Sequence, residues 1–219
     1  MNRMLYAVKN GYYIPFLYFG TYIITNDLFL STTIALKVYP INYFYWFNDK
    51  YSYLPNHNWI KQFVRFTDSG HIVSFLYYFY PKYLPLAFTI HYVITFGYWT
   101  GRILLQMEDS DKLYIHELDL RYENIWSSML HSFPLILLSH EIITKNECVP
   151  FGYENLKLSY AWEYFWFFCI YIPWRFYTGD CVYDIFSHKN SWKKIAGFLV
   201  FIHFTTLMGN FTGYYLRGC

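Results

Sequence analysis

Six segments of the chain contain no Lys or Arg and consist mainly of apolar and aromatic residues. A helix needs about 20 such residues to cross the hydrocarbon core of a bilayer, which is about 30 Å thick. Within lipid, a helix closes its backbone hydrogen bonds internally. The pattern therefore predicts an all-α fold, a single domain over residues 1–219 that forms a polytopic bundle of six transmembrane helices. The predicted spans are residues 11–36, 67–80, 84–100, 126–143, 158–174 and 195–216.

The composition agrees with a membrane protein. Only 15% of the 219 residues are charged, whereas soluble domains carry about 25%. The 26 Tyr and 8 Trp residues lower the mean hydropathy, although their rings suit a membrane interface. A net charge of +2 without a basic stripe predicts no nucleic-acid partner. The four cysteines show no CxxC spacing, so we expect no metal site and no cofactor.

Six crossings would place both termini on the same side of the membrane. Six of the 17 Lys and Arg residues fall on that side and the other 11 on the opposite side. Because positive charge favours the cytoplasmic side, the termini are predicted to lie outside the cytoplasm. We expect a multi-pass protein of the plasma membrane or the endoplasmic reticulum, with the lipid bilayer as its first partner. The sequence does not predict an oligomeric state.

Thr67 and His131 each stand at the start of a predicted span. The second and fourth spans run in the same direction, so both residues lie near the same membrane face. A threonine hydroxyl becomes a nucleophile when a base accepts its proton. His131 could be that base, and so could His71, which lies at i+4 on the same helical face. The residues alone leave open a simpler role, in which Thr67 or Asp68 caps the helix.

Other polar groups within the predicted spans admit two interpretations. Asp27 lies inside the first span, where an ionisable group marks a candidate functional site or caps a following helix. His71, His91, His131, His140 and His203 fall in or near spans, and a structural hydrogen bond is the ordinary explanation for each one alone. The pair His140-Glu141 suggests an interfacial ion pair or hydrogen bond. Gly179 is suited to a tight turn.

Three segments, in this order, carry a resemblance to a known family. In residues 66–78 the threonine and its aliphatic and aromatic frame match, whereas Gly70 replaces an Asn and Ser74 a Gln. In residues 127–141 His131, Pro134 and Glu141 match, whereas Ser127-Ser128 replaces Asn-His. Residues 178–185 keep Thr178, Gly179, Val182 and Tyr183, but Asp184 stands where the family has Pro. The chain resembles the androgen-induced and androgen-dependent transmembrane hydrolases, six-span proteins of similar length.

The resemblance implies a threonine hydrolase that acts within the membrane on lipid esters, specifically fatty acid esters of hydroxy fatty acids. At the matching positions, Thr67 would be the catalytic nucleophile and His131 the general base. The departures at Gly70, Ser127, Ser128 and Asp184 leave open a family member that has lost activity.

Two other functions are compatible with the sequence. The first is a non-enzymatic polytopic protein that serves as a scaffold or a regulator of another membrane protein. The second is a b-type haem oxidoreductase that uses helix-borne histidine pairs, such as His71 or His91 with His131 or His203.

Overall fold

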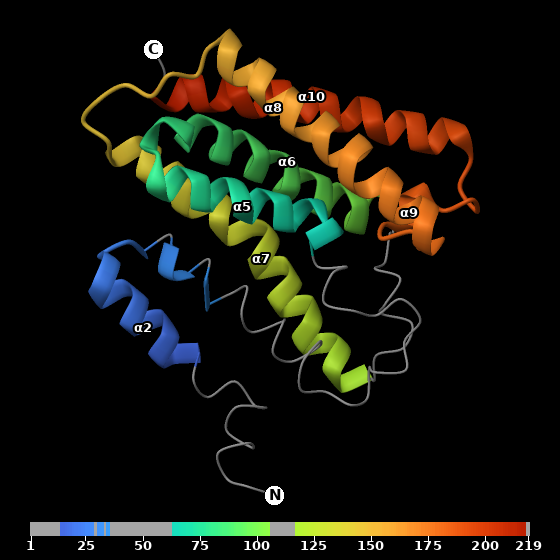
Figure 1. Ribbon diagram of the computed structural model, residues 1–219, viewed down its shortest axis with the longest axis horizontal. Helices are drawn as coiled ribbons and strands as arrows, with labels where there is room; N and C mark the ends of the chain where they lie inside the picture. The colour runs from blue at the N-terminus through green and yellow to red at the C-terminus, as the bar shows by residue number, and fades with distance from the viewer. Residues whose placement is uncertain (1–13, 29, 33, 36–62, 106–116, 218–219) are drawn as a thin grey trace, which may run out of the picture.

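A computed structural model describes residues 14–28, 30–32, 34–35, 63–105 and 117–217. These residues form helices joined by short connections, and none of them belongs to a β-strand (Figure 1). The all-α fold class is therefore confirmed. The helices are α2 (Ile14–Thr25), α5 (Phe66–Phe79), α6 (Leu84–Ile103), α7 (Glu117–Thr144), α8 (Tyr153–Phe165), α9 (Ile172–Thr178) and α10 (Trp192–Arg217). A π-helical segment (Trp166–Tyr171) joins α8 to α9, and short 3-10 turns occupy Pro81–Tyr83 and Asp184–Phe186.

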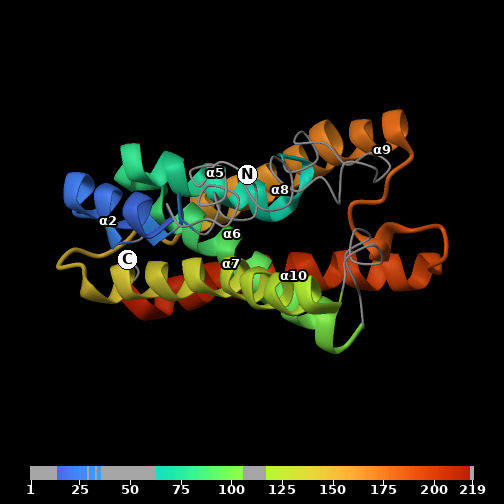
Figure 2. The same cartoon turned by 90° about the horizontal axis from the view of Figure 1, so that it is seen from below.

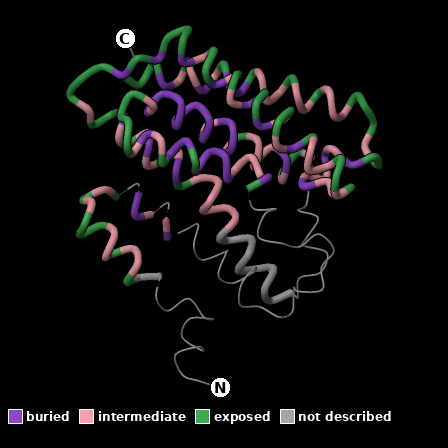
Figure 3. Tube along the Cα trace, viewed as in Figure 1, coloured by how far each residue is buried: buried purple, intermediate pink, exposed green. Residues whose placement is uncertain are grey.

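Helix α6 is the centre of the bundle. It packs against α5, α7, α8 and α10, and Figure 2 shows α7 and α10 along one side of it and α5 and α8 along the other. Every residue of its first half, Leu84–His91, is buried, and Figure 3 shows the buried residues gathered along α6 and α5. Pro81 begins the 3-10 turn between α5 and α6, and Pro85 lies in the first turn of α6. Proline is tolerated at such positions because the N–H that it lacks would have no partner within the helix, and its fixed φ favours the turn from α5 into α6.

Among the described residues, one helix is long and apolar enough to cross a membrane by length and composition, namely α10. The six-span bundle therefore stays a prediction. Helix α6 has 20 residues and α5 only 14. Residues 153–178 are helical throughout, because the π-helical segment continues α8 directly into α9.

The first predicted span, residues 11–36, is not one unbroken helix. Helix α2 ends at Thr25, and Asn26 follows with a φ of 50°, a conformation that Asn tolerates better than most residues. The Asp27 carboxylate accepts a hydrogen bond from the Leu30 amide at 2.8 Å. Asp27 therefore caps a new helical segment, which is the second of the two interpretations that the sequence left open.

The cysteines divide into two kinds that their spacing did not distinguish. Cys148, in the connection between α7 and α8, is disulfide-bonded. Cys169 and Cys181 are free thiols.

Two glycines of α10 give a test of the packing. A Cβ on Gly213 would lie 2.2 Å from Cε1 of the buried Phe151 ring, whereas a Cβ on Gly197 would meet nothing within 4 Å. Alanine gains about 1 kcal/mol over glycine in a helix interior, but overpacking a core costs about 1–3 kcal/mol. We expect Gly213→Ala to lower the thermal stability of the purified protein and Gly197→Ala to preserve or raise it. Equal melting temperatures for the two variants would contradict this packing.

Candidate functional site

Thr67 is the second residue of α5 and does not cap it. Arg65 occupies the N-cap position in an extended conformation, and no side chain makes a capping hydrogen bond there. The interpretation that Thr67 or Asp68 caps the helix is therefore wrong. The Thr67 hydroxyl is used elsewhere.

The hydroxyl of Thr67 contacts the imidazole of His131. Thr67 Oγ1 lies 2.9 Å from His131 Nε2, although the two residues are 64 positions apart in the chain. The other ring nitrogen, His131 Nδ1, lies 2.5 Å from the carbonyl oxygen of Ser127. A carbonyl only accepts, so Nδ1 carries the proton and Nε2 presents its lone pair to the threonine. This is the arrangement in which a base can accept the proton of a hydroxyl nucleophile.

The structure selects His131 over His71 as the partner of Thr67. The His71 ring is buried and packs edge-on against the His91 ring, with 5.4 Å between the ring centroids. Thr67 makes no hydrogen bond to it in the described part of the chain. The i+4 spacing that made His71 a candidate does not bring its ring to the hydroxyl.

Helix α6 holds His131 in place with three side chains of one face. The Tyr98 ring stacks on the imidazole at a centroid distance of 4.0 Å and an angle of 14°. The Thr95 hydroxyl donates to the His131 carbonyl at 2.5 Å, and the Trp99 indole donates to the Ser132 hydroxyl at 2.9 Å. The sequence analysis missed these residues. Their i, i+3 and i+4 spacing was the available signal, but it also describes an ordinary packed face.

Thr67 and His131 lie in the wall of one cavity of about 300 Å³. That volume is at the lower end of the range for small-molecule sites. The cavity runs between α6, the π-helical segment and α10, and most of its lining is aliphatic or aromatic. Lining residues from these elements include Ile94, Gly97, Trp166, Phe167, Phe198 and Ile202. The lining makes this space suited to an apolar ligand.

The third matching segment also reaches this site. Gly179 ends α9 in the left-handed conformation, with a φ of 70°, which confirms the predicted tight turn. The turn carries the chain back, so that Val182 and Tyr183 line the cavity. The Tyr183 hydroxyl accepts a hydrogen bond from the Phe66 amide at 2.7 Å. All three segments of the resemblance therefore meet around the start of α5.

The first turn of α5 offers a candidate donor for a developing oxyanion. The amides of Asp68 and Ser69 donate to the Arg65 carbonyl at 3.0 and 3.3 Å, and the Phe66 amide donates to Tyr183. The first amides of a helix have no acceptor within the helix. For the Thr67 amide, which lies beside its own hydroxyl, no hydrogen bond is found within the described part of the chain.

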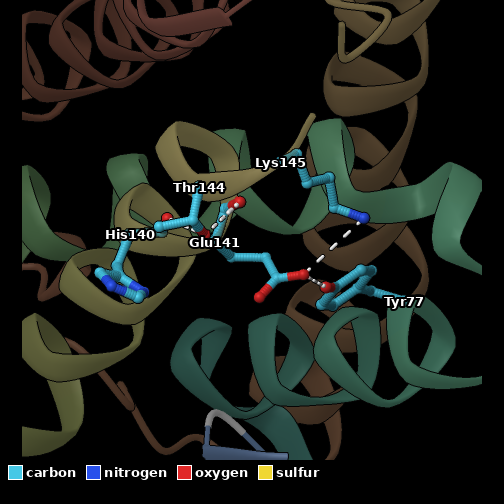
Figure 4. Close-up of polar contacts among 5 residues, drawn as sticks. All are labelled: Tyr77, His140, Glu141, Thr144 and Lys145. Atoms are coloured by element: carbon cyan, nitrogen blue, oxygen red, sulfur yellow. Dashed lines mark hydrogen bonds and ion pairs between the residues drawn. The ribbon is translucent and has the colours of Figure 1, made fainter. Parts of the chain in front are cut away.

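His140 and Glu141 lie at the far end of α7, about 15 Å along the helix from His131. The Tyr77 hydroxyl donates to Glu141 Oε1 at 2.8 Å, and Lys145 Nζ lies 3.7 Å from the same oxygen (Figure 4). The hydroxyl of Thr144 donates to the His140 carbonyl. This cluster joins the ends of α5 and α7 and contains the hydrogen bond and the ion pair that the sequence suggested for this pair of residues. It does not line the cavity of Thr67.

The histidines of the haem hypothesis are not brought into a haem-binding pair in the described structure. His91 Nε2 lies 2.8 Å from Ser74 Oγ, and His203 Nε2 lies 2.6 Å from the Tyr164 hydroxyl. His131 faces Thr67. The His71 ring packs edge-on against the His91 ring.

The tautomer of His131 can be measured directly. The acceptor at Ser127 requires the proton on Nδ1 in the resting protein. We expect the ¹⁵N NMR spectrum of histidine-labelled protein to show the Nδ1-protonated rings of His131 and His203. The signal of His131 should disappear in His131→Gln, and both signals should persist in His140→Gln. A His131 ring with its proton on Nε2 would contradict the arrangement.

The comparisons with known proteins give no family for this chain. No protein-family model matches it, and no curated protein and no solved structure matches it either. The site is therefore described by its own side chains: a hydroxyl that faces an oriented imidazole at the wall of an apolar cavity.

Proposed function

We propose that the protein is an intramembrane hydrolase of lipid esters, with Thr67 as nucleophile and His131 as general base. The hydrogen bond between these two side chains at the wall of an apolar cavity carries the proposal. The resemblance to the androgen-induced and androgen-dependent hydrolases supports the substrate class, a fatty acid ester of a hydroxy fatty acid.

The reaction proceeds in two stages. His131 Nε2 accepts the proton of the Thr67 hydroxyl while Oγ1 attacks the ester carbonyl, and the Thr67 amide donates to the resulting oxyanion. The tetrahedral intermediate collapses, the protonated imidazole returns its proton to the leaving alcohol, and an acyl-threonine remains. His131 then accepts a proton from water, which attacks the acyl group. As the bond between the acyl carbon and Oγ1 breaks, the imidazole returns this proton to Oγ1, and the fatty acid and the free threonine are released.

The distribution of side chains supports burial of the bundle in lipid. Large apolar residues point outward on many helices, whereas several hydroxyl groups lie inside. Monomeric soluble proteins rarely expose such extensive apolar surface, and in lipid this surface needs no other cover. Outward residues include Phe16, Ile24, Val200 and Phe211, and fully buried polar residues include Thr89, Ser159 and Thr206.

Helix lengths also support several crossings. The 20 residues of α6 rise about 30 Å, the thickness of the hydrocarbon core. The helical run 153–178 is longer still. Tyr and Trp reduce the hydropathy of these helices, but both are favoured at membrane interfaces.

The disulfide of Cys148 supports the predicted orientation. Disulfides persist in oxidising compartments and are rare in the cytosol. In the six-span topology, the connection that contains Cys148 lies on the side of the termini, outside the cytoplasm. The starts of α5 and α7, and with them Thr67 and His131, then lie toward the cytoplasm.

Activity measurements test the catalytic pair. We expect Thr67→Ala and His131→Ala each to lower hydrolysis of a fatty acid ester of a hydroxy fatty acid by at least about 1,000-fold, because a nucleophile and its base act as one unit. Thr144→Ala and His140→Ala, at the far end of α7, are matched controls and should keep the wild-type rate.

A fluorophosphonate probe should label the wild-type protein and fail to label Thr67→Ala. Wild-type rates in both catalytic variants would refute the mechanism. A folded wild-type protein that neither hydrolyses the ester nor reacts with the probe would favour the alternative, a non-enzymatic scaffold or regulator.

Thiol labelling tests the orientation. In intact cells, an impermeant reductant followed by an impermeant maleimide should label the peptide that contains Cys148, as read by mass spectrometry. Cys181 lies on the opposite side in this topology and should be labelled only after permeabilisation. Labelling of Cys181 in intact cells would contradict the orientation.

A further inference from the structure

A second polar group in the cavity wall has no part in the proposed reaction. Glu163 of α8 is 7% exposed and lines the same cavity as Thr67. Its Oε1 accepts a hydrogen bond from the Thr206 hydroxyl of α10. No described residue makes a hydrogen bond to Oε2. A buried oxygen without a partner is costly, so this atom is suited to meet a group of the ligand.

Residues of α8 and of the π-helical segment that continues it place Glu163 close to the start of α5. Trp166, three residues later, donates its indole N–H to the Val64 carbonyl at 2.8 Å, and its ring packs on Phe66 with 5.0 Å between centroids. On the other flank, the Trp162 indole donates to Ser69 Oγ at 3.3 Å. Glu163 lies about 4.5 Å along the helix from Trp166. A chain whose ester group is at Thr67 can therefore reach the carboxyl group.

The other polar groups near Glu163 are already engaged. His203 Nδ1 lies 2.9 Å from the Leu199 carbonyl and therefore donates to it. Its Nε2 is then an acceptor for the Tyr164 hydroxyl at 2.6 Å. Most of the remaining lining is apolar, for example Val93, Phe198 and Ile202, and its charged members besides Glu163 are Arg102 and Asp184. The matching ligand is a long apolar chain with one polar group along its length.

The chemistry of a buried carboxyl group favours a hydroxyl as that polar group. A hydroxyl both donates and accepts, so it pairs with Glu163 whether the carboxyl group is charged or neutral. An ammonium group would bring a full charge into an apolar cavity and pay a much larger desolvation cost.

We propose that the cavity binds a lipid chain that carries a free hydroxyl group in addition to its ester, and that Glu163 recognises this hydroxyl through Oε2. Glu163 is then a specificity-determining residue and takes no part in bond cleavage. The proposal rests on the proposed function for the position of the ester at Thr67. Binding itself requires no hydrolysis, so the two can be tested separately.

Binding to the purified full chain with Thr67→Ala measures recognition without turnover. The ligands are methyl stearate and a series of methyl hydroxystearates that differ in the position of the hydroxyl. We expect at least one hydroxylated ligand to bind about 10-fold more tightly than methyl stearate, which corresponds to one good hydrogen bond in a buried site. Glu163→Leu should reduce that ratio to about 1, and Glu163→Gln should retain part of it.

Glu154→Leu is the matched control, because Glu154 is an exposed carboxylate on the same helix and should leave the ratio unchanged. Melting curves test whether Glu163→Leu is folded. If this variant is unfolded, Glu163→Gln and the ligand series in the Thr67→Ala protein decide whether Glu163 recognises the hydroxyl. Equal affinities for all ligands would overturn the proposal, and so would tighter binding of methyl 12-aminostearate. Hydrolysis of methyl stearate by the wild type without any hydroxyl preference would refute this inference and leave the proposed function standing. Preferential binding of a hydroxylated ligand without any ester hydrolysis would support this inference and refute the proposed function.

Discussion

The contact of α6 with both α5 and α7 is the constraint on which the site depends. Thr67 and His131 belong to different helices, and neither helix alone fixes the distance between them. Gly70 lets α5 approach α6 closely, since a Cβ there would lie 2.3 Å from Ile94 Cδ1. On the other side, Thr95, Tyr98 and Trp99 of α6 hold α7 at His131. The 2.9 Å distance between Thr67 Oγ1 and His131 Nε2 therefore depends on both helix contacts, α5 with α6 and α6 with α7.

The same contact bears on one position at which the chain differs from the family that it resembles. At Gly70 the resembling family has an Asn, whose side chain would need the space that Ile94 fills here. Ile94 of α6 therefore occupies the space that a side chain at position 70 would need. Because Gly70 affects how the helices pack and contributes no functional group, its change does not remove a component of the proposed reaction.

Sequence reasoning reached the all-α class, because apolar runs give helices. It named Thr67 but left His71 and His131 open as its partner, and the resemblance pointed to His131. It also found the turn at Gly179, where a positive φ requires a special residue. It missed Tyr98, Glu163 and the contact of Tyr183 with the Phe66 amide, since these depend on which helix faces meet. Asp68 has the residue type of a cap, but the start of α5 is set by Arg65 and Tyr183. Each of these contacts depends on packing between residues far apart in the chain, which the local sequence pattern does not encode.

The short length of α5 bears on how a lipid would reach Thr67. Its 14 residues rise about 21 Å, against about 30 Å for the hydrocarbon core. In the proposed bundle, the C-terminal end of α5 lies at one boundary of the hydrocarbon core. Because the helix is shorter than the core is thick, its first residues, including Thr67, would then lie inside the hydrocarbon core. A lipid ester could then reach the hydroxyl without leaving the bilayer. The neutral Ser127 carbonyl, in place of a carboxylate, orients His131 there without burying another charge, a cost that lipid would increase.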